Sequence, residues 1–114
     1  MTRIYKILPR RDWEAALAAG LHEGSPLDLA DGFIHFSAAD QVRETARRHF
    51  AGQDDLVVLA VDAESLGPAL KWERSRDGAL FPHLYGALAA ARVIEARAAP
   101  LDAEGFPDPG DLAP

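Results

Sequence analysis

The sequence contains no cysteine, which excludes disulfides, thiolate nucleophiles and cysteine-bound zinc or iron–sulfur centres. It has no secretory leader pattern and no apolar run of about 18 residues that would span a membrane. Neither common glycine-rich phosphate loop occurs, because both G-x-G-x-x-G and G-x-x-x-x-G-K are missing. We therefore expect a cytoplasmic protein without membrane partners and without a Rossmann or P-loop nucleotide site.

Positive charge is also scarce: 12 lysine and arginine residues face 18 aspartate and glutamate residues, and the net charge is −6. An average field of this sign repels a phosphate backbone, so broad nucleic-acid binding is not expected. The length of 114 residues suits one domain with a single core. We expect this domain to cover residues 1–99, followed by a loosely attached, acidic and proline-rich tail over residues 100–114.

Five segments have the alternation or the β-branched and aromatic composition of strands. They are residues 3–8, 32–36, 55–63, 69–75 and 91–98. The segment DLVVLAVDA at 55–63 has almost no polar member and predicts a central strand buried on both faces. Residues 22–31 and 76–86 are expected to be loops, the second with room for a short strand at its end.

A first helix is predicted over residues 10–21. Asp12 is its expected cap and Gly20 its left-handed stop. The face that docks on the sheet is expected to consist of Trp13, Ala16 and Leu17.

A second helix is predicted over residues 38–50, since Ser37 and Asp40 match a capping box and Gly52 follows the end. Its buried stripe is expected to be Val42, Thr45, Ala46 and His49. Two helices and about five strands without an internal repeat indicate the α+β class.

Two histidines stand in short apolar contexts, His35 in GFIHF and His83 in LFPHLYG. If Ile34 and Phe36 point to the core, strand alternation turns His35 to the opposite face. A lone histidine in such a place more often has a structural role than a chemical one, and Ser37 is explained as a helix cap. Alternation therefore makes His35 available to a site without assigning one.

The segment 71–86 gathers acidic, basic, imidazole and phenol groups, a combination typical of binding loops. The groups belong to Glu73, Arg74, His83 and Tyr85. A structural interpretation stays equally open, with the acid and the arginine as a strand-edge pair and the aromatic residues as an apolar lid.

The order and spacing of IYKIL, DWEAALAAG, DGFIHFS, DDLVVLAVDA, KWERS and LFPHLYGAL resemble the bacterial family known as domain of unknown function 952, over about residues 3–98. Through remote similarity this resemblance implies an ADP-ribosyltransferase-like fold, in which a split, mixed or antiparallel sheet grips NAD between its halves. In such folds a first-strand residue holds the nicotinamide ribose, a second strand stacks on the nicotinamide, and a late acid assists catalysis.

On this chain the resemblance implies that the ribose-holding position falls at Lys6, where relatives often carry histidine. It implies catalytic roles for Glu73, His35 and His83. It implies that NAD, as a substrate, is bound by Lys6, Phe36, Ser37, Arg74 and Tyr85. A carboxylate near the ribose would stabilise the oxocarbenium-like centre that forms as nicotinamide departs.

Three hypotheses follow for the function. The first is an NAD-utilising ADP-ribosyltransferase-like enzyme or a binder of NAD or ADP-ribose. The second is a non-catalytic binding or interaction domain, favoured by lysine in place of histidine at Lys6, with the acidic tail as a partner-binding arm. The third is a metal-dependent hydrolase with His35, His83 and Glu73 as ligands, although no short-range histidine pair occurs and no metal is expected.

Overall fold

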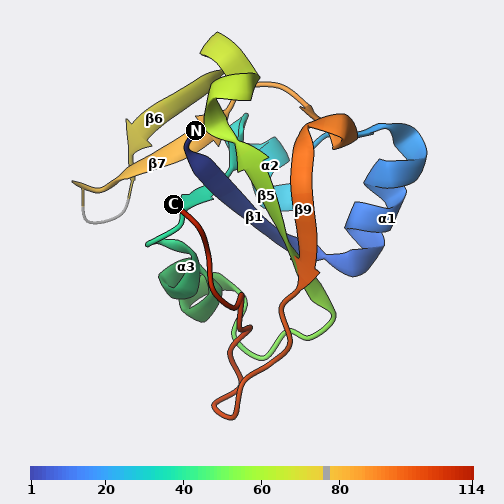
Figure 1. Ribbon diagram of the computed structural model, residues 1–114, viewed down its shortest axis with the longest axis vertical. Coiled ribbons are helices and arrows are strands. Elements are labelled where there is room, and N and C mark those ends of the chain that lie inside the picture. The colour runs from blue at the N-terminus through green and yellow to red at the C-terminus, as the bar shows by residue number, and fades with distance from the viewer. Residues whose placement is uncertain (76–77) are drawn as a thin grey trace.

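A four-stranded antiparallel sheet forms the centre of the computed structural model, which describes residues 1–75 and 78–114 (Figure 1). The strand order is β4 (Ser37–Ala38), β1 (Arg3–Pro9), β5 (Leu56–Asp62) and β9 (Val93–Ala98). As predicted, β5 is a central strand buried along nearly its whole length. The α+β class is confirmed, with antiparallel pairing throughout the described strands.

A second, three-stranded antiparallel sheet lies beside the first. Its order is β3 (Ile34–His35), β7 (Leu80–Leu84) and β6 (Leu70–Arg74). The chain leaves this sheet at Phe36, which separates β3 from β4, and thereby joins the two sheets. A further pair consists of β2 (Leu21–His22) and β8 (Leu88–Ala89), and the short 3-10 helices are η1 (Ala63–Ala69) and η3 (Ala90–Arg92).

The predicted loop at 76–86 is instead largely strand β7, although its first residues, Arg76 and Asp77, lie outside the described residues. Pro82 is tolerated within this strand because its carbonyl accepts the Phe36 N–H at 3.0 Å. A strand residue turns its nitrogen and its carbonyl to the same side, so the missing proline donor faces the end of β3 and not β6.

Helix α1 (Arg10–Ala19) is confirmed, and it ends at Gly20, whose φ of 88° is the predicted left-handed stop. Asp12 was wrong as the cap, because Pro9 occupies the N-cap position and Asp12 lies in the first turn. The docking face is narrower than predicted, since Ala16 is buried whereas Leu17 is exposed.

Helix α3 (Val42–His49) is shorter than the predicted 38–50, and the capping box was wrong. Ser37 pairs with Tyr5 as part of β4, and its hydroxyl bonds that of Thr45 at 2.9 Å. Strand pairing therefore takes the residue that the local pattern assigned to the helix. Val42 is buried as expected, whereas His49 at the helix end is exposed.

Helix α2 (Pro26–Asp31) occupies the segment predicted as the loop 22–31. Ser25 is its N-cap, and Ser25 and Asp28 form a reciprocal capping box, with Pro26 in the first turn. These local signals outweigh the loop-like composition of the segment.

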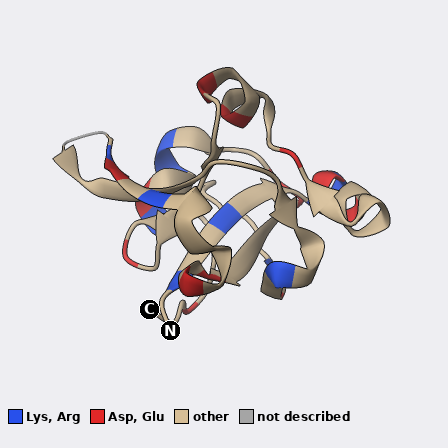
Figure 2. Cartoon of the chain, turned by 90° about the horizontal axis from the view of Figure 1, so that it is seen from above, with Lys and Arg blue, Asp and Glu red and all other residues tan. Residues whose placement is uncertain are grey.

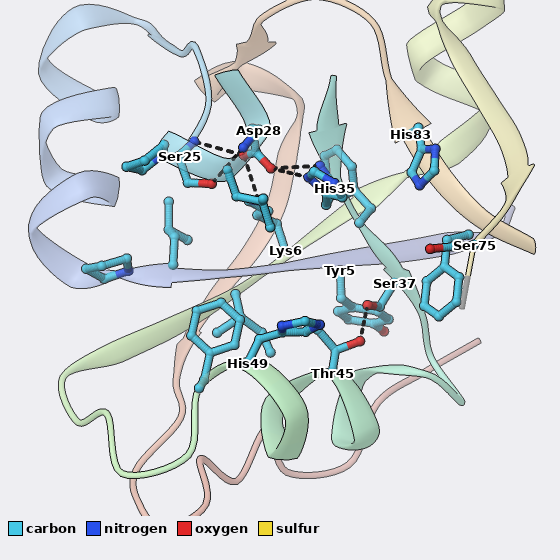
Figure 3. Close-up of a pocket in the computed structure, with 18 residues that line it drawn as sticks. Tyr5, Lys6, Ser25, Asp28, His35, Ser37, Thr45, His49, Ser75 and His83 are labelled. Atoms are coloured by element: carbon cyan, nitrogen blue, oxygen red, sulfur yellow. Dashed lines mark hydrogen bonds and ion pairs between the residues drawn. The ribbon is translucent and has the colours of Figure 1, made fainter. Parts of the chain in front are cut away.

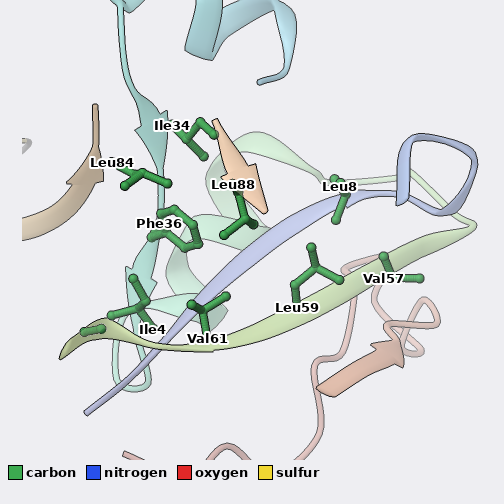
Figure 4. Close-up of a cluster of buried hydrophobic side chains, with 10 residues drawn as sticks. Ile4, Leu8, Ile34, Phe36, Val57, Leu59, Val61, Leu84 and Leu88 are labelled. Atoms are coloured by element: carbon green, nitrogen blue, oxygen red, sulfur yellow. The ribbon is translucent and has the colours of Figure 1, made fainter. Parts of the chain in front are cut away.

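The central sheet separates two apolar clusters. One face carries alternate residues of β1 and β5, which pack with residues of β3, β7 and β8 (Figure 4). Its main members are Ile4, Leu8, Phe36, Leu59, Val61, Leu84 and Leu88. The opposite face is covered by α3 and the C-terminal segment, and its main members are Tyr5, Ile7, Val42, Ala46, Val58 and Ala99.

The expectation of a loosely attached tail was wrong, because residues 100–114 fold back along α3 (Figure 1). Pro109 is fully buried. The Arg97 guanidinium donates to the carbonyl of Asp111 at 2.7 Å, and the Tyr5 hydroxyl donates to the carbonyl of Ala113. The Arg47 guanidinium also lies 4.4 Å from the centre of the Phe106 ring. The tail therefore covers the second apolar cluster.

Acidic and basic residues are intermingled along the chain (Figure 2). None of the described helices is both long and apolar enough to cross a bilayer.

Candidate functional site

A pocket of about 450 Å³ lies along the edge of β1 where that strand loses its neighbour (Figure 3). In the described register β4 pairs with β1 only at Ile4 and Tyr5, and the pocket lining continues from Lys6 to Pro9. Helices α2 and α3 and strands β3 and β7 contribute the other walls. The short pairing of β4 therefore leaves the space in which the pocket forms.

A buried ionic network lies at one end of the pocket, around the carboxylate of Asp28. Lys6 Nζ donates to Asp28 Oδ2 at 2.8 Å, and the two side chains are only 7% and 2% exposed. Asp28 Oδ2 also accepts the Ser25 N–H at 2.8 Å, while Oδ1 accepts the backbone N–H of His35 at 3.1 Å. The imidazole of His35 contacts the same Oδ1 through Nδ1 at 2.6 Å.

These contacts hold Asp28 in its ionised form. Burial alone would raise the pKa of Asp28, but the hydrogen bond from His35 and the charge of Lys6 outweigh it and hold that pKa far below its usual range. Burial lowers the pKa of Lys6, and the nearby carboxylate opposes this shift. Lys6 and Asp28 are both removed from water, and the charge of each is compensated by the other.

His22 is close enough to Lys6 and Asp28 to feel their charges, but it does not line the pocket. It is buried, and its Nε2 has no hydrogen-bond partner within the described part of the chain. Burial, with a smaller contribution from the charge of Lys6, lowers the pKa of His22 and favours the neutral ring.

A second polar cluster surrounds His83, which is buried and lines the pocket. His83 Nδ1 lies 2.8 Å from Glu73 Oε1, and the Tyr85 hydroxyl donates to the same oxygen at 2.7 Å. The hydrogen bonds from Tyr85 and from His83 lower the pKa of Glu73, and the carboxylate in turn raises the pKa of Tyr85.

The two clusters meet across the strand pair β3–β7. His35 and His83 are directly opposite in register, and their ring centres lie 5.6 Å apart. Phe33 stacks on His83 at 4.0 Å and also contacts His35 at 4.6 Å and Tyr85 at 5.3 Å. Ile34 and Phe36 point into the core, so the predicted alternation around His35 is confirmed.

Most of the site residues expected from the sequence converge here. Lys6, His35, Phe36, Ser37 and His83 line the pocket. Glu73 and Tyr85 are outside the lining, where Glu73 is bonded to His83 and Tyr85 donates to Glu73. Arg74 does not join the cluster, because its side chain donates to the carbonyl of Gly78 at 2.9 Å.

Sequence reasoning missed the acid at the centre of the site. Asp28 was placed in a loop, and Asp31, whose Oδ2 lies 2.9 Å from His35 Nε2, was overlooked with it. The signal that would have found them is the spacing from Ser25 to Asp28 with Pro26 between, since this pattern starts a helix. His49 and Thr45 also line the pocket and were predicted only as helix packing residues.

The described residues contain no group of three or more histidine, aspartate or glutamate side chains arranged to hold a metal ion. His35 and His83 instead each contact a carboxylate through Nδ1. The side chains named for the metal hypothesis are therefore engaged with one another and with their neighbours.

Comparisons with known proteins place the chain in a family without assigning an activity. The family model described as protein of unknown function (DUF952) matches residues 7–96. The crystal structure of protein CC0527 from the bacterium Caulobacter crescentus is similar, with 57% identity, a TM-score of 0.92 and coverage of 94% of each chain. A solution NMR structure of CC0527 is 58% identical, with a TM-score of 0.85 and coverage of 94% of this chain and 92% of that one.

A search of the curated proteins finds no match. The family model spans most of the chain, and the identity to CC0527 extends over nearly all of it. The chain therefore belongs to the DUF952 family of proteins of unknown function.

Proposed function

We propose that the pocket binds a nucleotide of the NAD or ADP-ribose type. The observation that carries this proposal is the convergence of five residues, expected from the ADP-ribosyltransferase-like resemblance, on one pocket. They are Lys6, His35, Phe36, Ser37 and His83. They come from β1, from the β3–β4 segment and from β7, three parts of the chain that the tertiary fold brings together.

The size and lining of the pocket support a ligand of this class. A volume of about 450 Å³ lies within the range of about 300–1,000 Å³ that is usual for small-molecule sites. Apolar and aromatic side chains, among them Ile7, Phe50 and Phe81, line much of it and suit a heteroaromatic ring. The Lys6–Asp28–His35 network supplies polar groups at one end, which suits a ligand with an apolar ring and a polar remainder.

The placement of the acids favours binding over bond cleavage. Asp28 is the one acid among the described residues that line the pocket, and both of its oxygens already accept hydrogen bonds from the protein. Glu73, expected to act beside the ribose, is outside the lining and bonded to His83 and Tyr85. A carboxylate stabilises developing positive charge only when it faces the reacting carbon. The non-catalytic binder is therefore the preferred form of this proposal.

The test is a thermal-shift titration with NAD, ADP-ribose, nicotinamide and zinc. A ligand present at a hundred times its Kd adds about 2.7 kcal/mol to the free energy of unfolding, which corresponds to a rise in Tm on the order of 10 °C for a domain of this size. We expect such a rise with NAD or ADP-ribose in the wild type. It should persist in Arg74→Ala, whose side chain is outside the pocket, and be lost in Lys6→Met.

The quantity compared in each variant is the rise on adding ligand, so a lower starting Tm does not obscure it. No rise with either nucleotide would contradict the proposal. A rise with zinc alone would favour the metal-dependent hydrolase.

A further inference from the structure

The two histidines of the pocket are held in different ways. Both ring nitrogens of His35 face carboxylates, Nδ1 that of Asp28 and Nε2 that of Asp31. This arrangement uses all of the hydrogen-bonding capacity of the ring within the protein. His83 is bonded only through Nδ1, to Glu73, and within residues 1–75 and 78–114 its Nε2 makes no hydrogen bond.

The position of Glu73 orients the free nitrogen. His83 lines the pocket, and its Nδ1 is bonded to Glu73, which is outside the lining, so Nε2 is the ring nitrogen left for a ligand. An ionised carboxylate only accepts hydrogen bonds, and therefore Nδ1 carries a proton. In the neutral imidazole the other nitrogen, Nε2, then carries the lone pair.

We propose that Glu73 is a positioning residue that fixes His83 in the Nδ1–H tautomer, so that the bare Nε2 accepts a hydrogen bond from a hydroxyl group of the bound ligand. This assignment rests on the proposed function only for the identity of the ligand, whose hydroxyl is then a ribose hydroxyl. Glu73 therefore acts on the ligand through the His83 imidazole, and not directly beside the ribose as expected from the sequence.

The neighbours of the ring keep this geometry in place. The Tyr85 hydroxyl donates to the same Oε1 as His83, which orients the carboxylate. Phe33 stacks on the imidazole at 4.0 Å and restrains its plane. The His83 side chain is only 7% exposed, so water competes weakly for Nε2.

The same geometry specifies what this end of the pocket rejects. A lone pair on Nε2 repels a phosphate or carboxylate oxygen and favours a neutral donor. The sugar of a nucleotide, and not its pyrophosphate, is therefore the part that contacts His83.

The decisive experiment records long-range ¹H–¹⁵N correlations of the histidine rings in the ligand-free protein at neutral pH. We expect the Nδ1–H pattern for His83 in the wild type. Glu73→Ala should shift it toward the mixture of tautomers found for a free imidazole. Tyr85→Phe, which removes one donor to Glu73 and keeps the carboxylate, should leave the tautomer unchanged and serves as the matched control.

Binding of ADP-ribose tests the acceptor role. His83→Phe keeps a ring for stacking on Phe33 and removes the acceptor, so the affinity should fall about fivefold, the usual worth of one hydrogen bond. Equal affinity of this variant and the wild type would overturn the acceptor role.

Failure of this inference is distinguishable from failure of the proposed function. An Nε2–H pattern in the wild type, or an unchanged pattern in Glu73→Ala, would overturn the role of Glu73 even if ADP-ribose binds. If neither nucleotide raises the Tm, the proposed ligand is wrong. The spectra of the ligand-free protein still show which tautomer His83 adopts.

Discussion

At the scale of single residues, the Asp28 side chain links several elements of the structure around the pocket. Its carboxylate compensates a buried ammonium, Lys6, closes the capping box of α2 and holds the ring of His35. Because these partners come from β1, α2 and β3, one side chain fixes the relative positions of three elements. The network is therefore as much a structural clamp as a part of the pocket wall.

We expect Asp28→Ala to lower the free energy of unfolding by about 3–5 kcal/mol at pH 7, since removing one partner leaves the buried Lys6 uncompensated. Urea denaturation measures this loss. Asp31→Ala is the matched control, because that carboxylate is 43% exposed and such surface pairs contribute about 0–1 kcal/mol. Similar losses in the two variants would mean that the buried pair has no special weight.

Asp28 also predicts an acid dependence of stability. Its pKa is lower in the folded protein than its unfolded value of 3.8, so its contribution is fully present above pH 3.8 and is lost as the pH falls below that value. The advantage of the wild type over Asp28→Asn should therefore shrink as the pH is lowered from 5 toward 2. Unfolding curves of both proteins across this range measure it, and a constant difference would contradict the depressed pKa.

At the scale of elements, α2 is a six-residue helix that forms one wall of the pocket and depends on its cap. Ser25→Ala removes the hydroxyl that accepts the Asp28 N–H and should cost about 0.5–2 kcal/mol in the free energy of unfolding, whereas glycine at this position should cost only a few tenths. Urea denaturation of the alanine and the glycine variant measures which of the two loses more stability. If alanine and glycine proved equal, the cap would not be the reason for the helix.

The elements differ in how far the sequence predicts them, and the difference follows from what stabilises each one. The apolar run of β5 and the residues that follow Pro9 in α1 carry their own signals, and both elements form as predicted. The two-residue strands β3 and β4 depend on partners 32–50 positions away in the chain. Such pairing overrode the local capping pattern at Ser37 and turned the predicted loop around Pro82 into a strand.

The candidate site also has residues that the sequence predicts and residues that depend on the tertiary structure. Alternation was enough to free His35 from the core, and the composition of segment 71–86 was enough to group Glu73, His83 and Tyr85, which the structure joins by hydrogen bonds. Asp28 was missed because the capping pattern that places it in a helix was not recognised, and its burial opposite Lys6 depends on the tertiary structure. Arg74 was overestimated because adjacent strand residues point to opposite faces, which separates its side chain from that of Glu73.

At the scale of the whole molecule, residues 100–114 complete the second apolar cluster beside α3. We expect deletion of these residues to lower the free energy of unfolding on the order of 3 kcal/mol, because side chains such as Pro109 and Leu112 lose their burial. Arg47→Ala removes only surface contacts of the tail and should cost less than about 1 kcal/mol. Thermal unfolding measures both changes. A deletion that leaves the stability unchanged would mean that the segment is only loosely attached.

The pairing of His35 with His83 has a consequence for how this region of the chain tolerates change. Because β3 has only two residues, few ladder hydrogen bonds fix its register with β7. The contrast between its polar and apolar faces therefore sets most of that register. A shift of β3 by one position would turn His35 toward the core and drive Ile34 and Phe36 outward, while His83 on β7 would keep its place. A single-residue insertion or deletion between 33 and 36 therefore inverts the pocket wall and the core together. This segment has to preserve its length as well as its alternation of polar and apolar side chains.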